Sequence, residues 1–229
     1  GAGIIDVGGE STRPGAEPVP VEEELRRVVP VIEALARDAD VPISIDTRKP
    51  AVAEAAIDAG ATIVNETSGE ELDPAMDKVI ASTGAGIIVM HSRGTPATMR
   101  ELTDYDDVVA DVAAFLQQRA GELESIGVPH DAIAIDPGFG FAKDAGQSLT
   151  MLRRFEEFVA LGYPVLAGTS RKSFIGAVLD TEESDRLEGT AVTAALAVAK
   201  GARIVRVHDV KEMSRVVTMA AAVLSPEVA

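Results

Sequence analysis

Short apolar runs recur along the chain and constrain its fold more than any other feature. The runs are mostly β-branched and are flanked by Gly, Pro or Asp, as buried strands are. Longer stretches with helical periodicity lie between them. Regular alternation of strand and helix is typical of a parallel sheet with crossover helices. The seven expected strands cover residues 4–7, 43–45, 62–64, 87–90, 133–135, 164–167 and 203–207.

The number of runs favours a (β/α)₈ or TIM barrel over an open doubly wound sheet, although both folds alternate strand and helix. A complete barrel uses about 250 residues, or about 31 per unit, so a chain of this length holds about seven units. The chain enters a strand directly after Gly1, Ala2 and Gly3. We therefore predict an α/β TIM barrel whose first strand is missing from this chain. We expect one domain over residues 1–229, because no linker or low-complexity segment interrupts it.

Proline and glycine mark the ends of several expected helices. Pro50 stands at a first helical position, and Gly60 closes that helix. Pro30 lies inside the periodic stretch 22–37, so we expect that helix to kink there or to consist of two pieces. Further helices are expected after Asp73 and over 106–126, 174–179 and 212–224.

The charge balance excludes several classes of function. The chain carries 21 Lys and Arg against 37 Asp and Glu, for a formal charge of −16. It therefore lacks the basic surface that a protein needs to bind nucleic acids or anionic membranes. No apolar run approaches the roughly 18 residues of a membrane span, and the absence of cysteine excludes disulfides and thiolate chemistry. We expect a cytoplasmic protein with no nucleic-acid or membrane partner.

Polar residues follow the expected strands at their C-terminal ends, whereas the strand starts carry nothing comparable. The catalytic residues of parallel barrels gather at this end of the strands. The asymmetry indicates an enzyme, because a purely structural barrel does not need polar side chains after its strands. The residues that stand out are Asp46, Asn65, His91, Asp136, the segment 168–173, and Arg206 with His208.

Several of these residues also have a purely structural interpretation. Asp46 could cap the helix that begins at Pro50, and for this residue alone we would favour the cap. Asn65 could hold a turn through its own backbone, and Asp136 begins an Asp-Pro-Gly turn sequence. His208 and the following Asp could form an orienting pair or another cap.

The segment 168–173, Gly-Thr-Ser-Arg-Lys-Ser, is harder to explain by structure alone. It places two cations and three hydroxyls between a strand and the short helix 174–179. The N-terminus of a helix favours an anion. Arg13, Arg206 and His208 could converge on the same anion.

The carboxylates and the cations suit different parts of one ligand. Asp46 and Asp136, with the amide of Asn65, match the N–H groups of a guanidine-like or amide edge. Lys172 and Arg206 suit a phosphate or a carboxylate. The implied ligand is a small molecule with a donor-rich heterocycle at one end and an anion at the other.

Six motifs in this order resemble the dihydropteroate synthase family, the folate-biosynthesis enzymes that sulfonamides inhibit. They cover nearly the whole chain. The motifs are 6–15 (DVGGESTRPG), 44–47 (SIDT), Asn65 with 68–69 (SG), 136–141 (DPGFGF), 170–172 (SRK) and 206–209 (RVHD).

The resemblance implies a (β/α)₈ barrel with transferase activity. The family condenses 6-hydroxymethyl-7,8-dihydropterin pyrophosphate with p-aminobenzoate, and the products are 7,8-dihydropteroate and pyrophosphate. Mg²⁺ assists the reaction, so it is the expected cofactor. The resemblance also implies a homodimer that often uses the last helices, and it allows fusion to another folate enzyme.

The resemblance further implies a role for each site residue. The pterin would be held by Asp46, Asn65, Met90, Asp136, Gly168 and Lys172. The p-aminobenzoate pocket would be lined by Arg13, Pro14, Phe141 and Ser173. Pyrophosphate would be bound by Ser11, Thr12, Arg13, Arg206 and His208. The catalytic set would be Lys172, Asp46, Asp136, Arg206 and His208.

The sequence departs from the family pattern at two places. The family begins with a strand and a loop whose Asn helps to bind Mg²⁺, and that unit is absent here, so we expect no metal ligand in this chain. A barrel of seven strands would also expose two strand edges, which suggests a fragment of a longer protein. Glu66 stands where the family more often has Asp.

Two other functions stay open on the sequence alone. A pterin-binding methyltransferase barrel shares the pterin carboxylates, but motifs 170–172 and 206–208 disfavour it, because a methyl donor carries no pyrophosphate. The other alternative is an inactive pterin-binding fragment of a fused folate enzyme.

Overall fold

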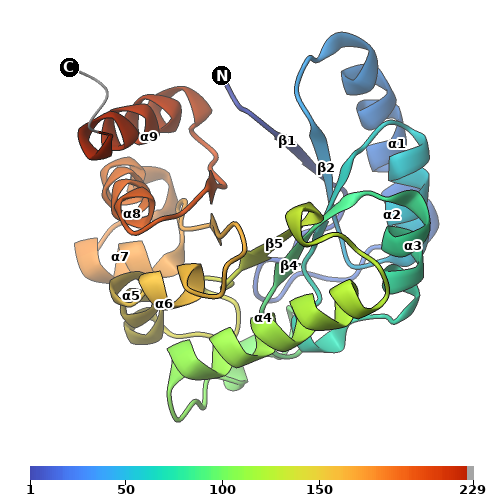
Figure 1. The fold of residues 1–229 in the computed structure, drawn as a ribbon. Helices are drawn as coiled ribbons and strands as arrows, with labels where there is room; N and C mark the ends of the chain where they lie inside the picture. Colours follow the sequence, from blue (N-terminus) through green and yellow to red (C-terminus); the bar gives the residue numbers. More distant parts are fainter. Residues whose placement is uncertain (226–229) are drawn as a thin grey trace.

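Parallel strands that follow one another in chain order form the centre of the fold (Figure 1). The computed structural model describes residues 1–225, and it confirms all seven expected strands there. Residues 226–229 of the expected domain lie outside this range. The strands are β1 (Ile5–Gly8), β2 (Ile43–Thr47), β3 (Ile63–Glu66), β4 (Gly86–Met90), β5 (Ile133–Asp136), β6 (Leu166–Ala167) and β7 (Ile204–Val205).

The strands pair in sequential order around an open ring. β1 to β5 form one parallel sheet, and β6 pairs with β7. A parallel bridge between Ile135 and Val165 links β5 to the segment that enters β6. This order and direction are those of a (β/α) barrel, in agreement with the predicted fold class.

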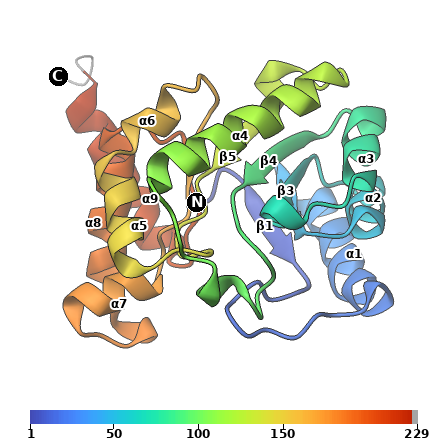
Figure 2. The ribbon, with the colours of Figure 1, turned by 90° about the horizontal axis from the view of Figure 1, so that it is seen from below.

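Helices surround the strands on the outside (Figures 1 and 2). In residues 1–225, no helix combines the length and the apolar character needed to cross a bilayer. The helices are α1 (Val21–Asp38), α2 (Pro50–Asp58), α3 (Ala75–Thr83), α4 (Val108–Ser125), α5 (Ala145–Arg153), α6 (Glu156–Val159), α7 (Ser173–Leu179), α8 (Leu187–Ala199) and α9 (Val210–Leu224).

Helix α1 corrects one expectation, because it runs through Pro30 as a single element. Pro30 and Arg26 both lie on the exposed side of the helix. The carbonyl of Arg26, which loses its usual i+4 donor, can therefore be hydrated. The alternative of two helical pieces was therefore wrong, the alternative of a kink at Pro30 stays a prediction, and Pro50 begins α2 as predicted.

The core is divided between the outside and the inside of the ring. The larger apolar cluster packs the strands against the surrounding helices. A separate small cluster of Ile88, Ala134 and Leu166, with Ile63 and Ile204 against it, comes from the alternate faces of β3 to β7. Because side chains alternate along a strand, the two clusters occupy opposite faces of the same strands.

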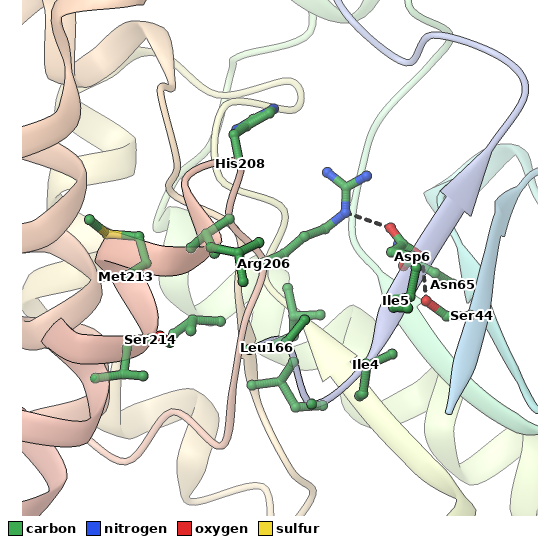
Figure 3. Close-up of a pocket in the computed structure, with 18 of the residues that line it drawn as sticks. Ile4, Ile5, Asp6, Ser44, Asn65, Leu166, Arg206, His208, Met213 and Ser214 are labelled. Atoms are coloured by element: carbon green, nitrogen blue, oxygen red, sulfur yellow. Dashed lines mark hydrogen bonds and ion pairs between the residues drawn. The ribbon is translucent and has the colours of Figure 1, made fainter. Parts of the chain in front are cut away.

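The ring of strands is open between β7 and β1. No backbone pairing joins these two strands in the described part of the chain, and a groove of about 630 Å³ separates them. Ile4 lines the groove on one side, and Met213 lines it on the other (Figure 3). At the C-terminal end of the strands, Arg206 reaches across to Asp6. The opening lies where an eight-stranded barrel has one more strand.

The loop after β5 passes very close to the end of β4. Gly138 has a φ of +70°, and a Cβ atom there would lie 2.0 Å from the carbonyl oxygen of His91. Gly84, which follows α3, has the same φ of +70° but has no atom within 4 Å of the position of its Cβ. The two glycines therefore share a backbone conformation and differ in the space around them.

We expect Gly138→Ala to lower the free energy of unfolding more than Gly84→Ala does. Gly84→Ala carries only the left-handed backbone penalty, about 1–2 kcal/mol. Gly138→Ala must also displace the backbone of His91, so we expect a loss of about 3 kcal/mol or more. Urea unfolding, monitored by far-UV circular dichroism, measures the free energy of unfolding of both variants. Equal losses in the two variants would contradict the close approach of the loop to β4.

Candidate active site

A small cavity of about 40 Å³ lies at the C-terminal ends of the strands and brings most of the predicted site residues together. The predicted residues that line it are Thr12, Asp46, Asn65, Met90, Asp136, Phe141, Gly168, Lys172, Arg206 and His208. The lining also includes Thr67, Phe139 and Ser170, to which we assigned no role from the sequence. Four predicted residues are not part of this lining, namely Ser11, Arg13, Pro14 and Ser173.

The strand register explains why these side chains meet. Asp46 of β2 lies beside Asn65 of β3, and Met90 of β4 lies beside Asp136 of β5. Each of these residues stands at or near the C-terminal end of its strand. Because the strands are parallel, their C-terminal ends form one rim.

Two buried carboxylates form the floor of the site. Asp46 is 8% exposed, and it accepts hydrogen bonds from Thr67 Oγ1 at 3.2 Å and from Arg206 Nη2 at 3.1 Å. The capping interpretation of Asp46 is wrong, because Lys49 occupies the N-cap position of α2 and no side chain caps the helix there. Asp136 is 7% exposed, and its Oδ1 accepts the backbone N–H of Gly138 at 2.8 Å. Asp136 therefore holds the expected turn and also lines the cavity.

Burial shifts the protonation of both carboxyls. It raises the pKa of Asp46 to about 7, together with the nearby charge of Asp6 and against the attraction of Arg206. Burial also raises the pKa of Asp136, which the Gly138 amide and Lys172 oppose. Carboxylates with raised pKa values are stabilised when a ligand donates N–H groups to them.

Asp6 is a site residue that we did not predict by role, although it lies in a quoted motif. Its carboxylate accepts hydrogen bonds from Ser44 Oγ at 2.5 Å, Asn65 Nδ2 at 3.2 Å and Arg206 Nε at 2.6 Å (Figure 3). Asn65 of β3 is thus oriented by Asp6 of β1, which lies on the other side of β2, and the interpretation of Asn65 as a turn residue is wrong. The available signal was an Asp inside an otherwise apolar strand.

Lys172 lies between the carboxylates and an aromatic ring. Its Nζ is 4.1 Å from the centroid of the Phe141 ring, within range of a cation–π contact. Burial lowers the pKa of Lys172 to about 8, although the charge of Asp136 opposes this shift. The ammonium is therefore close to half-neutral in mildly alkaline solution.

The loops after β6 and β7 are bound to each other beside the cavity. Ser170 Oγ lies 2.9 Å from His208 Nδ1 and accepts the His208 amide N–H at 3.2 Å. Arg171, whose φ is +56°, donates to both Asp209 oxygens at 3.0 and 2.5 Å. Asp209 therefore neither orients His208 nor caps α9 through its side chain, so both structural interpretations of this pair were wrong.

Burial lowers the pKa of His208, and the nearby Arg206 and Arg171 guanidiniums lower it further. A neutral imidazole beside two arginines can still donate or accept one hydrogen bond toward the cavity.

The loop after β1 forms the mouth of the site. Arg13 is exposed and pairs with Glu183 across the mouth at 2.7 Å, and the amide of Gly15 donates to Pro96 O at 2.8 Å. Lys49 anchors the start of this loop through Glu10 at 2.7 Å and through the buried Glu24. The structure thus places Arg13 at the entrance, while Thr12 faces the cavity.

Glu66 does not line the cavity. Its buried carboxylate accepts the backbone N–H of Ser68 at 2.7 Å, and burial raises its pKa. The extra methylene of Glu relative to Asp is therefore accommodated by the turn after β3, away from the carboxylates Asp46 and Asp136.

Comparison with known proteins agrees with this arrangement. Residues 1–208 match the family described as pterin binding enzyme. The chain is 48% identical over 221 residues to the dihydropteroate synthase of Synechocystis sp., covering 96% of this chain and 76% of that protein. It is 50% identical over 226 residues to a probable bifunctional folylpolyglutamate synthase/dihydropteroate synthase of Haloferax volcanii, covering 99% of this chain and 27% of that protein.

A solved structure agrees with the fold as well. It is the dihydropteroate synthase of Thermus thermophilus in complex with 4-aminobenzoate, with a TM-score of 0.90 and 46% identity over 97% of this chain and 84% of that one. The family match spans most of the chain, and these relatives share nearly half of its residues. The chain therefore belongs to the pterin-binding enzyme family, among the dihydropteroate synthases.

Proposed function

We propose that residues 1–229 form a single pterin-binding barrel domain that carries out the dihydropteroate synthase reaction at this cavity. The pterin methylene of 6-hydroxymethyl-7,8-dihydropterin pyrophosphate would be transferred to the amine of p-aminobenzoate. The observation that carries this proposal is the arrangement of Asp46 and Asp136 beside Lys172, with Arg206 and His208 at the rim. It provides acceptors for a heterocycle and donors for an anion within one site.

The buried carboxylates would hold the pterin. A pterin presents a guanidine-like edge of N–H groups, and Asp46 and Asp136 are buried acceptors whose pKa values are raised by burial. Asn65 is fixed by Asp6, so its amide oxygen can face the same ring. Met90 and Gly168 complete the lining of this subsite.

Arg206 would bind the pyrophosphate. Two of its N–H groups already bond Asp6 and Asp46, and the side chain is 46% exposed. A guanidinium has five N–H donors, so others can face an anion. His208 beside it, with the hydroxyls of Ser11 and Thr12, would add donors without adding negative charge.

The chemistry then needs no covalent enzyme intermediate. The neutral amine nitrogen of p-aminobenzoate forms a bond to the pterin methylene as the carbon–oxygen bond to pyrophosphate breaks. The bonding electrons leave with pyrophosphate, and the amine proton is lost to solvent or to the departing anion. Arg206 and His208 stabilise the charge that builds on the leaving group. Asp46 and Asp136 stabilise the electron-poor pterin.

The p-aminobenzoate would enter at the mouth of the site. Phe141 lines the cavity against Lys172, and Arg13, Pro14 and Ser173 would extend this subsite toward the entrance. Arg13 would exchange Glu183 for the carboxylate of the substrate, since their pair is exposed and so is worth little. Sulfonamides, which carry a similar aromatic amine, would compete here.

Mg²⁺ is the cofactor that the resemblance implies, and we assign it no ligand in this chain. No group of three or more His, Asp or Glu residues in 1–225 is arranged to hold a metal ion. Asp6, a carboxylate near the anion subsite, is occupied by Ser44, Asn65 and Arg206. We therefore assign no step to Mg²⁺, and the absence of a metal ligand in this chain stays a prediction.

The outer faces of α8 and α9 would form a homodimer interface. Val192 and Leu196 on α8 are 59% and 46% exposed, and Met219 and Val223 on α9 are 63% and 73% exposed. The two helices pack side by side (Figure 1). Exposed apolar side chains gathered on neighbouring helices are typical of an interaction surface. The cytoplasmic location and the fusion to another folate enzyme stay predictions.

We expect Lys172→Ala to reduce turnover while the fold is retained. Removing a positioned cation from the reacting site should lower kcat by about 10²–10³-fold. A coupled pyrophosphate-release assay measures turnover, and circular dichroism checks the fold. Lys78→Ala on the exposed side of α3 is the matched control and should leave turnover unchanged. Full activity in Lys172→Ala would refute the role of this residue.

We expect the affinity for 6-hydroxymethylpterin, which lacks a titrating phosphate, to fall with decreasing pH. The ligand binds the carboxylate form of Asp46, whose pKa is raised to about 7. Below that pKa, binding must first release a proton, so affinity should drop by about tenfold per pH unit. Calorimetry in buffers of different ionisation enthalpy measures the affinity and the released proton.

Asp46→Asn tests the assignment of that proton. The variant should bind about 10- to 100-fold more weakly in mildly alkaline buffer, because a charge-assisted hydrogen bond is lost. It should also lose most of the pH dependence. An unchanged pH dependence would assign the proton to another group.

We expect Leu196→Glu to dissociate the dimer. Val31 is equally exposed, at 46%, and belongs to α1, a helix on the opposite side of the molecule from α8 and α9 (Figure 1). Val31→Glu therefore adds the same charge at matched exposure and should leave the molar mass of the dimer in solution unchanged. Sedimentation equilibrium measures this molar mass for both variants. A wild-type monomer, or a dimer that survives Leu196→Glu, would contradict the proposed interface.

A further inference from the structure

Lys143 is a buried lysine for which the proposed reaction has no use. It follows the 136–141 motif, and it is 7% exposed. Among residues 1–225, the lysines in ion pairs are Lys49 and Lys200, not Lys143. Burial lowers the pKa of Lys143 to about 7. A buried amine that forms no ion pair with a carboxylate destabilises the fold. Stability alone therefore does not explain this lysine.

The amine of Lys143 bonds three acceptors on two separate loops. Its Nζ donates to the carbonyl oxygen of Phe141 at 2.8 Å and to the carbonyl oxygen of His91 at 3.3 Å, and it lies 2.9 Å from His91 Nδ1. His91 follows β4, whereas Phe141 lies in the loop after β5. Lys143 therefore binds the second loop to the end of β4.

The His91 ring is a fixed anchor for this contact. Burial lowers the pKa of His91 to about 2, so the imidazole is neutral. The ring is buried and packs edge-on against Phe115, with centroids 5.1 Å apart. The His91 backbone N–H also donates to the carbonyl oxygen of Asp136 at 3.0 Å. His91 thus holds both ends of the loop, one directly and one through Lys143.

The loop itself has a backbone that needs support. Gly138 and Gly140 have φ values of +70° and +74°, and Ala142, directly before Lys143, has a φ of +49°. A left-handed conformation is unfavourable for alanine, because its Cβ atom lies too close to the following carbonyl oxygen. Side-chain contacts that select this conformation therefore determine where Phe141 lies.

We propose that Lys143 is a positioning residue for the reaction, because it holds the Phe141 backbone so that the Phe141 ring stays against the ammonium of Lys172. This inference rests on the proposed function, in which Phe141 lines the p-aminobenzoate subsite. Lys143 is not among the residues that line the cavity. Its effect reaches the reaction through the position of one ring.

Lys143→Met tests this role, because it keeps the length of the side chain and removes the N–H donors. We expect KM for p-aminobenzoate to rise about 10- to 100-fold, since a misplacement of about 1 Å can cost that much. KM for the pterin pyrophosphate should change by less than about threefold. A variant that loses thermal stability and keeps both KM values would show a structural role and overturn the proposal.

A double-mutant cycle with Phe141→Leu tests the path of the effect. If Lys143 acts through the Phe141 ring, Lys143→Met should change KM for p-aminobenzoate by less than about threefold in the Phe141→Leu background. Additive effects would overturn the proposal. Lys78→Met, on the exposed side of α3, is the matched control and should leave both KM values unchanged.

A structural readout separates this inference from the proposed function. In a crystal structure of Lys143→Met, a Phe141 ring displaced by about 1 Å from Lys172 supports the role even if the wild type does not turn over these substrates. An unmoved ring refutes it. Lys143→Gln, with two N–H donors on a shorter side chain, should shift KM less than Lys143→Met. If neither variant folds, the lysine serves stability and the proposal is wrong.

Discussion

The contact of Arg206 with Asp6 and Asp46 connects the two ends of the strand series. Backbone hydrogen bonds join β1 through β5 and then β6 to β7, but none joins β7 to β1 in the described residues. Arg206 follows β7, and its guanidinium bonds Asp6 of β1 and Asp46 of β2. These carboxylates are mostly shielded from solvent, so screening weakens the contact less than at a free surface. The position of Arg206, which we propose binds the anion, therefore depends on Asp6 and on Asp46, which we propose faces the heterocycle.

This coupling explains how acceptors and donors coexist in so small a site. Asp6 and Asp46 repel each other, which contributes to the raised pKa of Asp46. Arg206 offsets part of that repulsion and is itself held between the two carboxylates. Burial acts on Lys172 in the opposite sense and lowers its pKa to about 8. The raised pKa of Asp46 and the lowered pKa of Lys172 both favour the neutral form of the side chain. A ligand that completes the hydrogen bonds of these groups therefore stabilises their charged forms.

The sequence predicted this fold because the strands and their polar ends are local features. An apolar run followed by Asp or Asn was enough to place Asp46, Asn65 and Asp136 at one rim. Contacts between distant segments were less predictable. Asp6 lies in the middle of a strand, and its importance comes from Arg206, 200 residues away. β6 and β7 are two residues long, shorter than their apolar runs, because an apolar pattern reports burial and not backbone pairing.

The supporting residues show most clearly why sequence could not give the whole site. Several cavity residues are held by a neighbour that does not line the cavity. Asp6 bonds the amide of Asn65, and Lys143 bonds the backbone of Phe141. The Arg171–Asp209 pair connects the two loops that carry Ser170 and His208. Such partners come from other loops and follow no fixed spacing along the chain. They matter because a reacting group must be held within a fraction of an ångström to be effective. The strands therefore place Asp46, Asn65 and Asp136 themselves, whereas charged and polar contacts between the loops position the site residues that follow the strands.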